Sequence, residues 1–360
     1  MAIIKILQLY DKKEWIKLCN GISGNDIYFY PQYLETCKYI MEGTAYCFVY
    51  IQDPGKYILY PFFKRKINSL DVFAQLSDEY FDITSPYGYS GYLSNCNDCD
   101  IRLFINKFDE YCREEKIVSE FIRFNPLLRN YEYRGLRDKL ELIKFNDTIY
   151  IDLTSPIEEI HQNFSSANMR NIKKAIKNDL KLVEMEFTDE NILKFYNIYT
   201  HTMDRLKASS FYYFNQEYFT SLKKQLNDSV KLFSIMNNVG EYLSMGIFFA
   251  FNKYVHYHLG GSWQEYLDMR PNNLLFLKVI EWAKKNGYEK MHLGGGRVQN
   301  DNLFRFKKSF SKLTLPFYIV KKVHNKKIYD ELVQINELYS KENTFMNFDE
   351  SFFPVYRRHY

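Results

Sequence analysis

The sequence predicts a two-domain protein of the α/β (α+β) class. Its 360 residues are enough for two domains of ordinary size. Stretches with the apolar spacing of helices alternate with shorter stretches that have the pattern of strands. A helix–strand–loop–strand order at residues 100–153 is echoed in the second half, although no literal repeat is visible. We therefore expect two similar halves.

The composition is typical of a soluble globular protein, with 46% hydrophobic and 26% charged residues. A net charge of +4 permits a phosphate or nucleic-acid ligand but is low for a protein that wraps duplex DNA. No run approaches about 18 apolar residues, and the N-terminal segment lacks the features of a signal peptide. We therefore expect a cytoplasmic protein without a transmembrane segment.

Six cysteines are scattered over the first third of the chain, and we expect them to be reduced. Only Cys96-Asn97-Asp98-Cys99 has the spacing of a metal-ligand pair. Neither a second such pair nor a nearby histidine pair accompanies it, so the sequence predicts no metal site.

The first half contains a hairpin and a tyrosine-rich loop. Strands at 46–51 and 57–63 flank a turn, and the loop at 80–92 has two glycines. Such a loop either binds a sugar or peptide through tyrosine faces or forms a turn-rich edge of the core. A helix at 100–116 and strands at 121–124 and 147–153 follow. Candidate substrate-binding residues here are Asp82, Tyr87, Tyr89 and Arg123.

The middle of the chain is helical. The helix at 165–178 has a basic side that either contacts phosphates or is simply solvated. A helix at 190–207 is followed by the aromatic cluster 211–214. A helix end beside an aromatic loop can line an acceptor pocket, although most of these rings are expected in the core. Arg205 and Tyr212 are the candidate substrate contacts of this region.

Residues 242–310 contain the best candidate for a functional site. An apolar strand at 242–251 and a second strand at 254–259 are followed by Gly260-Gly261, which we expect to end the second strand. A polar loop leads to a helix at 274–285 with Asn273 as its N-cap. Then come a short strand at 291–293, three glycines, a short helix capped by Asp301, and a strand at 317–321.

Two features of this stretch are expected at the same sheet edge. The loop before the 274–285 helix is suited to anions because free N–H groups and the helix dipole point there. The strand that ends in three glycines allows a ligand to approach the backbone closely. The candidate donor-binding residues are Gly260, Gly261, Ser262, Arg270, Asn272, Asn273, Gly294, Gly295 and Gly296.

Several phrases of the sequence resemble one family. HLGGSWQEYLDMRPNNLL, WAKKNGYEKMHLGGG and LFRFKKSF in the second half, with SPYGYSGY, IRFNPLL and TMDRLKAS before them, resemble the FemAB-type (BioF2-like) branch of the GNAT acyltransferase superfamily. Their joint order spans nearly the whole chain. The resemblance implies two tandem GNAT-like domains, each a mixed, mostly antiparallel sheet flanked by helices. The expected boundaries are 1–153, 154–335 with the donor site, and a tail at 336–360.

The resemblance implies transfer of an acyl group to an amine of a cell-envelope glycan or its precursor. Some members of the family use aminoacyl-tRNA to extend the peptide of a peptidoglycan precursor, and others use acetyl-CoA in polysaccharide pathways. The usual pyrophosphate loop, Gln/Arg-x-x-Gly-x-Gly/Ala, is missing here, which leaves acetyl-CoA and the 3′ end of an aminoacyl-tRNA open as donors. The expected partners are a small or glycan-linked acceptor, a tRNA end, and transiently a membrane-linked precursor, but no duplex DNA. A non-catalytic binding module that kept the fold is the remaining alternative.

Acyl transfer to an amine needs a neutral amine, a polarised carbonyl and a fixed geometry, without a metal or a covalent nucleophile. Backbone N–H groups near 259–262 could polarise the carbonyl. The candidate bases are His256, His258, Glu265 and Asp301; the two histidines share a strand face, although either one alone is more often structural. Lys307 matches a lysine in the family's Phe-Lys-x-x-Phe phrase and either neutralises a phosphate or oxyanion or is a surface lysine.

Overall fold

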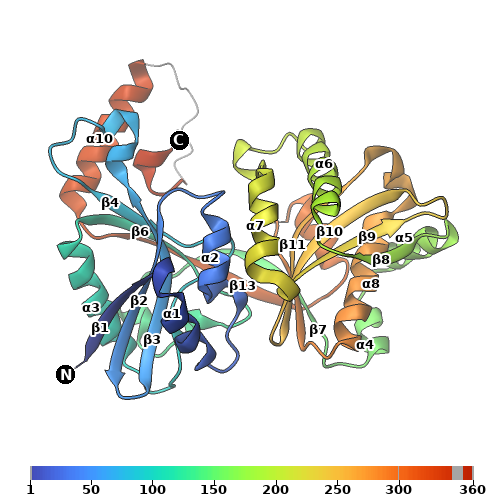
Figure 1. The fold of residues 1–360 in the computed structure, drawn as a ribbon, viewed down its shortest axis with the longest axis horizontal. Helices are drawn as coiled ribbons and strands as arrows, with labels where there is room; N and C mark the ends of the chain where they lie inside the picture. Colours follow the sequence, from blue (N-terminus) through green and yellow to red (C-terminus); the bar gives the residue numbers. More distant parts are fainter. Residues whose placement is uncertain (1, 299, 343–351, 359–360) are drawn as a thin grey trace. The chain divides into compact units, whose positions relative to one another are not determined.

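The computed structural model describes residues 2–298, 300–342 and 352–358, with the side chains of 341 and 342 left out. The chain forms two compact units (Figure 1). Unit 1 comprises Met1–Phe145 and Phe317–Tyr360, and unit 2 comprises Asn146–Pro316. The expected boundaries at 153 and 335 differ from this division because the last part of the chain returns to the first unit.

Unit 1 is a mixed sheet with the strand order β1-β2-β3-β4-β6-β13. Only β4 and β6 run parallel; the other neighbours are antiparallel. Helix α3 packs on one face through a cluster of aromatic rings. The strands are β1 (Ile3–Gln8), β2 (Thr44–Asp53), β3 (Lys56–Lys66), β4 (Phe81–Thr84), β6 (Ile117–Arg123) and β13 (Thr314–Val323), with β5 (Leu93–Ser94) paired to β3; the helices are α1 (Lys12–Asn20), α2 (Pro31–Cys37), α3 (Ile101–Glu114) and α10 (Lys326–Glu342).

The strands of unit 2 are also mixed in direction and have the order β7-β12-β11-β10-β9-β8. Only β11 and β12 run parallel. The strands are β7 (Ile143–Asp152), β8 (Lys181–Met185), β9 (Val230–Met236), β10 (Tyr242–Phe251), β11 (Tyr254–Ser262) and β12 (Lys290–Gly294); the helices are α4 (Ile157–Gln162), α5 (Ser166–Lys177), α6 (Asp189–Arg205), α7 (Gln216–Leu226), α8 (Pro271–Lys285) and α9 (Asn302–Lys308).

Helices cover both faces of the sheet in unit 2. Successive residues of a strand point to opposite faces, and β10 shows this at two neighbouring positions. Phe248 contacts Phe276 of α8, whereas Phe249 stacks on His258, which in turn contacts Tyr218 of α7. Helices α5 and α8 therefore lie on one face, and α6 and α7 on the other. Each unit has one parallel strand pair joined through a helix, which is the similarity between halves that the sequence predicts.

Two predicted boundaries in unit 2 were wrong. Strand β11 continues through Gly260 and Gly261 to Ser262 because these residues pair with β10. A Cβ on Gly261 would lie 2.6 Å from the carbonyl oxygen of Ile198 in α6, so the glycine permits close packing inside the unit. Helix α8 begins at Pro271, directly after a short 3₁₀ helix at Gln264–Met269, and its N-cap residue is Arg270 rather than Asn273.

The cysteines differ from expectation at one place. Cys96 and Cys99 form a disulfide, so the expectation of six reduced cysteines is wrong for this pair. Cys19, Cys37, Cys47 and Cys112 are free and buried. Within the described ranges, no helix is long and apolar enough to cross a membrane. The same residues contain no group of three or more His, Cys, Asp or Glu side chains arranged to hold a metal ion.

Candidate functional site

The candidate site lies where β11 and β12 diverge. The two strands pair in parallel only from Tyr254–Lys290 to His256–His292. Beyond that point β11 continues beside β10, and β12 follows β7 with a shift of register before Gly294. A bulge on β11 leaves His258 opposite no residue of β10. The strand tips therefore separate, and bulges of this kind are frequent beside active sites.

Lys307 bridges the two diverging strands. Its Nζ donates to the carbonyl oxygen of Gly295, just after β12, at 2.8 Å, and lies 5.6 Å from the ring centroid of Tyr257 on β11. Its side chain is 6% exposed, so the surface-lysine alternative does not hold. Burial lowers the pKa of Lys307 to about 8, and the nearby Asp301 carboxylate opposes part of that shift. The site thus holds a desolvated ammonium group at the divergence.

Asp301 is a capping residue rather than a base. Its carboxylate accepts from the backbone N–H groups of Phe304 at 2.7 Å, Arg297 at 2.7 Å and Val298 at 3.3 Å. Burial alone would raise its pKa, but these three donors outweigh that effect and lower the pKa. Its carboxylate is therefore engaged by three donors and has a lowered pKa, so it is a weaker proton acceptor than the expectation of a general base requires. Asp301 instead anchors α9, the helix that carries Lys307.

The three glycines serve the turn itself. Gly294 has a φ of 74°, a left-handed conformation that favours glycine. A Cβ on Gly295 would lie 2.9 Å from the carbonyl oxygen of Asp147, and one on Gly296 would lie 2.2 Å from Oδ1 of Asp301. The chain's own packing therefore requires these glycines, which differs from the expected role of admitting a ligand. Only the Gly295 carbonyl, through Lys307, belongs to the candidate site.

His256 and His292 are buried, and His258 is half-buried. His256 and His292 face each other with ring centroids 5.5 Å apart, and Nε2 of His258 lies 2.7 Å from the hydroxyl oxygen of Tyr218. Burial, with a smaller contribution from His256, lowers the pKa of His258 to about 3. The pKa of His292 is lowered well below its usual range for the same reasons. His258 therefore holds a proton too weakly to accept one from an amine near neutral pH, which corrects its expected role as a base.

A second group of polar residues gathers at the far end of β11. The Ser262 hydroxyl accepts from Nη2 of Arg205 at 3.4 Å and from Nδ2 of Asn272 at 3.2 Å, while the Ser262 N–H donates to Thr202. Helix α8 starts here without a side-chain cap. The Nε atoms of Arg205 and Arg270 are both buried without a hydrogen-bond partner. Two guanidinium donors beside an uncapped helix start form a suitable site for an anion. We call Arg205, Ser262, Arg270 and Asn272 the anion cluster.

Other expected donor contacts have internal roles. The amide of Asn273 donates to Asn168 at 2.8 Å, and Asn168 donates to the carbonyl oxygen of Ser309 at 3.1 Å, so Asn273 joins α8, α5 and the end of α9. Gly260 and Gly261 lie within β11. Asn273 and Gly261 therefore have packing roles, and a contact of the β11 main chain at Gly260 and Gly261 with a ligand stays a prediction. Glu265 is exposed on the 3₁₀ helix before α8.

The candidate substrate residues of unit 1 do not join this site. Asp82 is fully buried, and its carboxylate contacts Arg65 at 2.6 Å and Arg357 at 2.5 Å, so it forms an internal ion pair rather than a substrate contact. Arg123 donates to the carbonyl oxygens of Ser85 and Pro86, which fixes the start of the tyrosine-rich loop.

The tyrosine-rich loop itself packs against its own unit. The ring of Tyr89 contacts those of Tyr28 and Phe317, and the carbonyl of Tyr87 accepts from Tyr33. This arrangement supports the interpretation of the loop as an edge of the core. In unit 2, the ring of Tyr212 lies 5.1 Å from the guanidinium carbon of Arg297.

Sequence reasoning missed three residues of the site. Tyr257 faces Lys307, His292 faces His256, and Thr202 holds the N–H of Ser262. Tyr257 lies between His256 and His258 in the sequence, and the alternating pattern of a strand indicates no functional role for it. The parallel pairing of β11 with β12 brings His256 to His292, whereas the packing of α9 and α6 against β11 makes the other two contacts.

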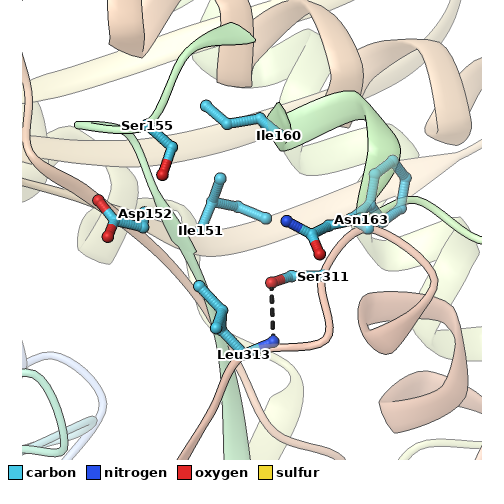
Figure 2. A pocket seen from close by; sticks show the side chains of 8 residues that line it. Ile151, Asp152, Ser155, Ile160, Asn163, Ser311 and Leu313 are labelled. Atoms are coloured by element: carbon cyan, nitrogen blue, oxygen red, sulfur yellow. Dashed lines mark hydrogen bonds between the residues drawn. The ribbon is translucent and has the colours of Figure 1, made fainter. Parts of the chain in front are cut away.

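A shallow hollow lies elsewhere in unit 2 and contains no predicted site residue. Its volume is about 230 Å³ including open solvent, and Figure 2 shows its lining by Ile151, Asp152, Ser155, Ile160, Asn163, Phe310, Ser311 and Leu313. Asp152 pairs with Lys290 at the start of β12, whereas the strands diverge at the other end of β12. The Ser311 hydroxyl accepts from the N–H of Leu313 at 3.0 Å, as Figure 2 shows. The hollow is therefore separate from the candidate site.

Comparisons with known proteins agree with the resemblance. Residues 166–308 match the family model for the acetyltransferase (GNAT) domain. The crystal structure of FemX matches with a TM-score of 0.66 at 14% identity, covering 91% of this chain and 99% of FemX. The C-terminal domain of a putative lysylphosphatidylglycerol synthetase from Agrobacterium fabrum matches with a TM-score of 0.54 at 11% identity, covering 88% of this chain and 94% of that one.

A tandem GNAT protein from the clavulanic acid biosynthesis pathway matches with a TM-score of 0.51 at 8% identity, covering 90% of this chain and 99% of that one. No protein of curated function matches the sequence. At these identities the structures establish a shared fold. The family match and the shared fold agree with the resemblance: residues 166–308 match the acetyltransferase (GNAT) domain, and the chain as a whole shares the fold of FemX and of a tandem GNAT protein.

Proposed function

We propose that the protein is an acyltransferase that passes an acetyl or aminoacyl group directly from its donor to an amine of a cell-envelope precursor. The observation that carries this proposal is Lys307, a buried ammonium group held between the separated tips of β11 and β12. A positive charge in a desolvated site stabilises the oxyanion that forms when an amine attacks a carbonyl. The donor carbonyl would lie beside Lys307 and the ring of Tyr257.

The backbone of β11 supports the same geometry. Beyond His256, the edge of β11 that faces β12 has no paired strand within the described part of the chain. Main-chain groups on that edge are available to a ligand, and N–H groups directed at a carbonyl oxygen add to the effect of Lys307. His258 and Asp301 are unsuited to take the proton of the acceptor amine, so this proton passes to His256, to Glu265, to solvent or to a group of the substrate.

The anion cluster supports a long, phosphate-bearing donor. Five residue steps separate Tyr257 from Ser262, which corresponds to about 16 Å along an extended strand. A donor with its acyl group at Lys307 and a phosphate at Arg205 and Arg270 would lie along β11. Both acetyl-CoA and the 3′ end of an aminoacyl-tRNA have phosphates at some distance from the acyl group.

The segment before α8 favours the aminoacyl-tRNA. A glycine loop that wraps a pyrophosphate is replaced by the 3₁₀ helix Gln264–Met269, and the N–H of Arg270 is already bonded to the carbonyl of Leu267 at 3.1 Å. The 3₁₀ helix fills part of the space of such a loop and leaves fewer free N–H groups. The segment therefore suits a single phosphate better than a pyrophosphate. The likeness to a putative lysylphosphatidylglycerol synthetase supports aminoacyl transfer by analogy.

Thermal unfolding and transfer assays distinguish the donors. A ligand at a hundred times its Kd stabilises the native state by about 2.7 kcal/mol. We expect such a shift, together with transfer to an amine acceptor, for aminoacyl-tRNA and a smaller or absent shift for acetyl-CoA. Replacing Lys307 by Met should lower kcat by about a hundredfold or more, and Lys308→Met, at an exposed neighbour, should not. Binding of both donors without any transfer would favour a binding module, and no binding of either would refute the proposal.

A further inference from the structure

Helix α5 exposes a row of cations along one side. Four basic residues of this helix are exposed and follow one another at intervals of three or four residues, which places them on the same side. We call them the α5 row: Arg170, Lys173, Lys174 and Lys177. The buried residues Asn168, Ile172 and Ala175 lie on the opposite side of the helix. The row extends about 10 Å along the helix axis.

The surroundings leave the α5 row positively charged. Within the described ranges, none of its four side chains makes an ion pair or a side-chain hydrogen bond. Residues 157–183 contain five Lys or Arg residues and three carboxylates. None of these carboxylates lies in α5; they are Glu158, Glu159 and Asp179. Helix α8, which packs against α5, adds three lysines and only one carboxylate, Glu281. This layer is therefore net positive even with every carboxylate ionised.

The first turn of α5 lies beside the anion cluster. The amide of Asn273 donates to Asn168 in that turn at 2.8 Å, and Asn273 directly follows Asn272 of the anion cluster. Figure 1 shows α5 next to α8, the helix that begins at the cluster. The α5 row therefore begins near the residues that we assign to a donor phosphate.

The other end of α5 leads back to the same end of the sheet. Lys181, at the start of β8, pairs with Met236 of β9, and Met236 pairs with Tyr242 of β10. Two residues further along β10, Ser244 pairs with Ser262 of the anion cluster. Both ends of α5 therefore lie towards the sheet end that carries this cluster.

We propose that the α5 row binds the phosphate backbone of an RNA duplex, namely the stem that follows the single-stranded 3′ end of an aminoacyl-tRNA. A duplex carries densely spaced phosphates, and lysine and arginine bind them without reading the sequence. With the acyl group at Lys307 and a phosphate of the single strand at the anion cluster, the stem would continue to α5. The inference rests on the aminoacyl-tRNA form of the proposed function, because coenzyme A has no duplex.

The side chains around the α5 row favour a duplex over other anionic partners. Proteins that hold single strands stack the bases on aromatic rings, and α5 has no aromatic residue. Binding to a bilayer surface requires several apolar side chains beside the cations. The apolar side of α5 is instead buried in the core, and Ile176 is the one exposed large hydrophobic side chain among the described residues of this helix. Cations alone suit the backbone of a duplex.

Binding of RNA to the full chain tests this proposal. The probes are a short RNA hairpin with an unpaired 3′ tail and the tail alone, each without an amino acid. We expect the hairpin to bind more tightly than the tail. The logarithm of its affinity should fall linearly with the logarithm of the salt concentration, because phosphate contacts release counterions.

Removal of two charges from the α5 row should weaken only the contact with the stem. Lys173→Gln/Lys174→Gln should weaken hairpin binding by about 30-fold near 0.15 M salt, or about fivefold for each cation, and lower the salt slope by about 2. Binding of the tail alone should not change. The matched control is Lys223→Gln/Lys224→Gln, at two adjacent lysines of α7 on the other face of the sheet, and it should leave both affinities unchanged. Arg205→Ala, in the anion cluster, should weaken the tail and the hairpin alike.

Three results would overturn the inference: a wild-type chain that does not bind the hairpin, α5 variants that bind it like the wild type, and equal weakening by the α7 control. Loss of binding to phosphatidylglycerol vesicles in α5 variants that keep the hairpin would make the row a membrane contact instead. The substituted side chains are exposed and glutamine suits a helix, so the variants should melt like the wild type. If the double variant melts early, Lys173→Gln alone should still weaken hairpin binding by about fivefold.

The same measurements separate this inference from the proposed function. Aminoacyl transfer by the wild type, with α5 variants that bind the hairpin normally, would leave the proposed function standing and remove the α5 contact. Hairpin binding that depends on α5, without transfer to any amine from either donor, would do the reverse.

Discussion

Replacing Lys307 by Met tests the buried charge through the pH dependence of stability. Burial lowers the pKa of Lys307 from 10.5 to about 8, against the opposing effect of Asp301. Each pKa unit corresponds to 1.36 kcal/mol, so the native state carries a cost of about 3 kcal/mol for holding this proton. Below pH 8 both the native and the unfolded chain are protonated, and the full cost is present.

The cost disappears as the pH rises from about 8 to 10.5. In this range the unfolded chain still holds the proton and the native state does not, so rising pH favours the native state. The free energy of unfolding of the wild type, minus that of Lys307→Met, should therefore rise by about 3 kcal/mol between pH 8 and 10.5. The lost hydrogen bond to Gly295 adds a constant that does not change this slope.

Urea unfolding of both proteins at several pH values measures this difference. Titration of all other groups is common to both proteins and cancels. The exposed neighbour gives the matched control, since Lys308→Met should show no such slope. A flat difference for Lys307→Met, or one that falls with pH, would refute a desolvated ammonium at the strand divergence and with it the role of Lys307 in the proposed chemistry.

Four further substitutions have expected outcomes. Asp301→Ala removes the acceptor of three N–H groups, so we expect a loss of about 2 kcal/mol in unfolding free energy and a lower kcat, measured by urea unfolding and the transfer assay; full activity at normal stability would contradict this. Asp82→Ala leaves the buried Arg357 with only the exposed Glu42 as a charged partner and should cost about 3 kcal/mol, while activity per folded molecule is retained. A melting temperature equal to that of the wild type would exclude a stabilising ion pair. Gly261→Ala forces a Cβ against the carbonyl oxygen of Ile198 and should lower the melting temperature. An unchanged melting temperature would contradict the close approach of α6 to β11. Arg205→Ala should raise the KM for the donor with little change in kcat, and an unchanged KM would remove it from the anion cluster.

Local patterns in the sequence were enough to predict most helices of unit 2, and the family resemblance predicted the mixed sheets. The role of Lys307 in the chemistry stays a prediction, although its burial excludes the surface-lysine alternative. The apolar run of β10 and the helical spacing of α8 are local signals, so periodicity finds them. The predicted end of β11 was wrong because two glycines usually stop a strand. Here the strand continues through them, and the close approach of α6 requires a glycine at Gly261. Tertiary packing decided this position, and no local pattern contains that information.

Long-range pairing explains the remaining errors. Asp82 is expected near a substrate because it lies in a loop rich in tyrosine, but its partner Arg357 is 275 residues further along the chain. The role of Asp301 was misassigned for a related reason: its carboxylate could serve as a base until the backbone N–H groups that occupy it are located. The sequence predicts which residues are polar, and only the fold reveals which of them are already engaged.

The return of the chain to unit 1 has a consequence for biosynthesis. All strands of the unit 2 sheet are available once the ribosome has passed Pro316, whereas unit 1 still lacks β13, α10 and the Arg357 side chain that neutralises Asp82. The later half can therefore mature before the earlier half, which reverses the usual order of synthesis. A nascent chain stalled far enough beyond Pro316 for this residue to leave the ribosome would carry a folded unit 2 and an unfinished, protease-sensitive N-terminal segment.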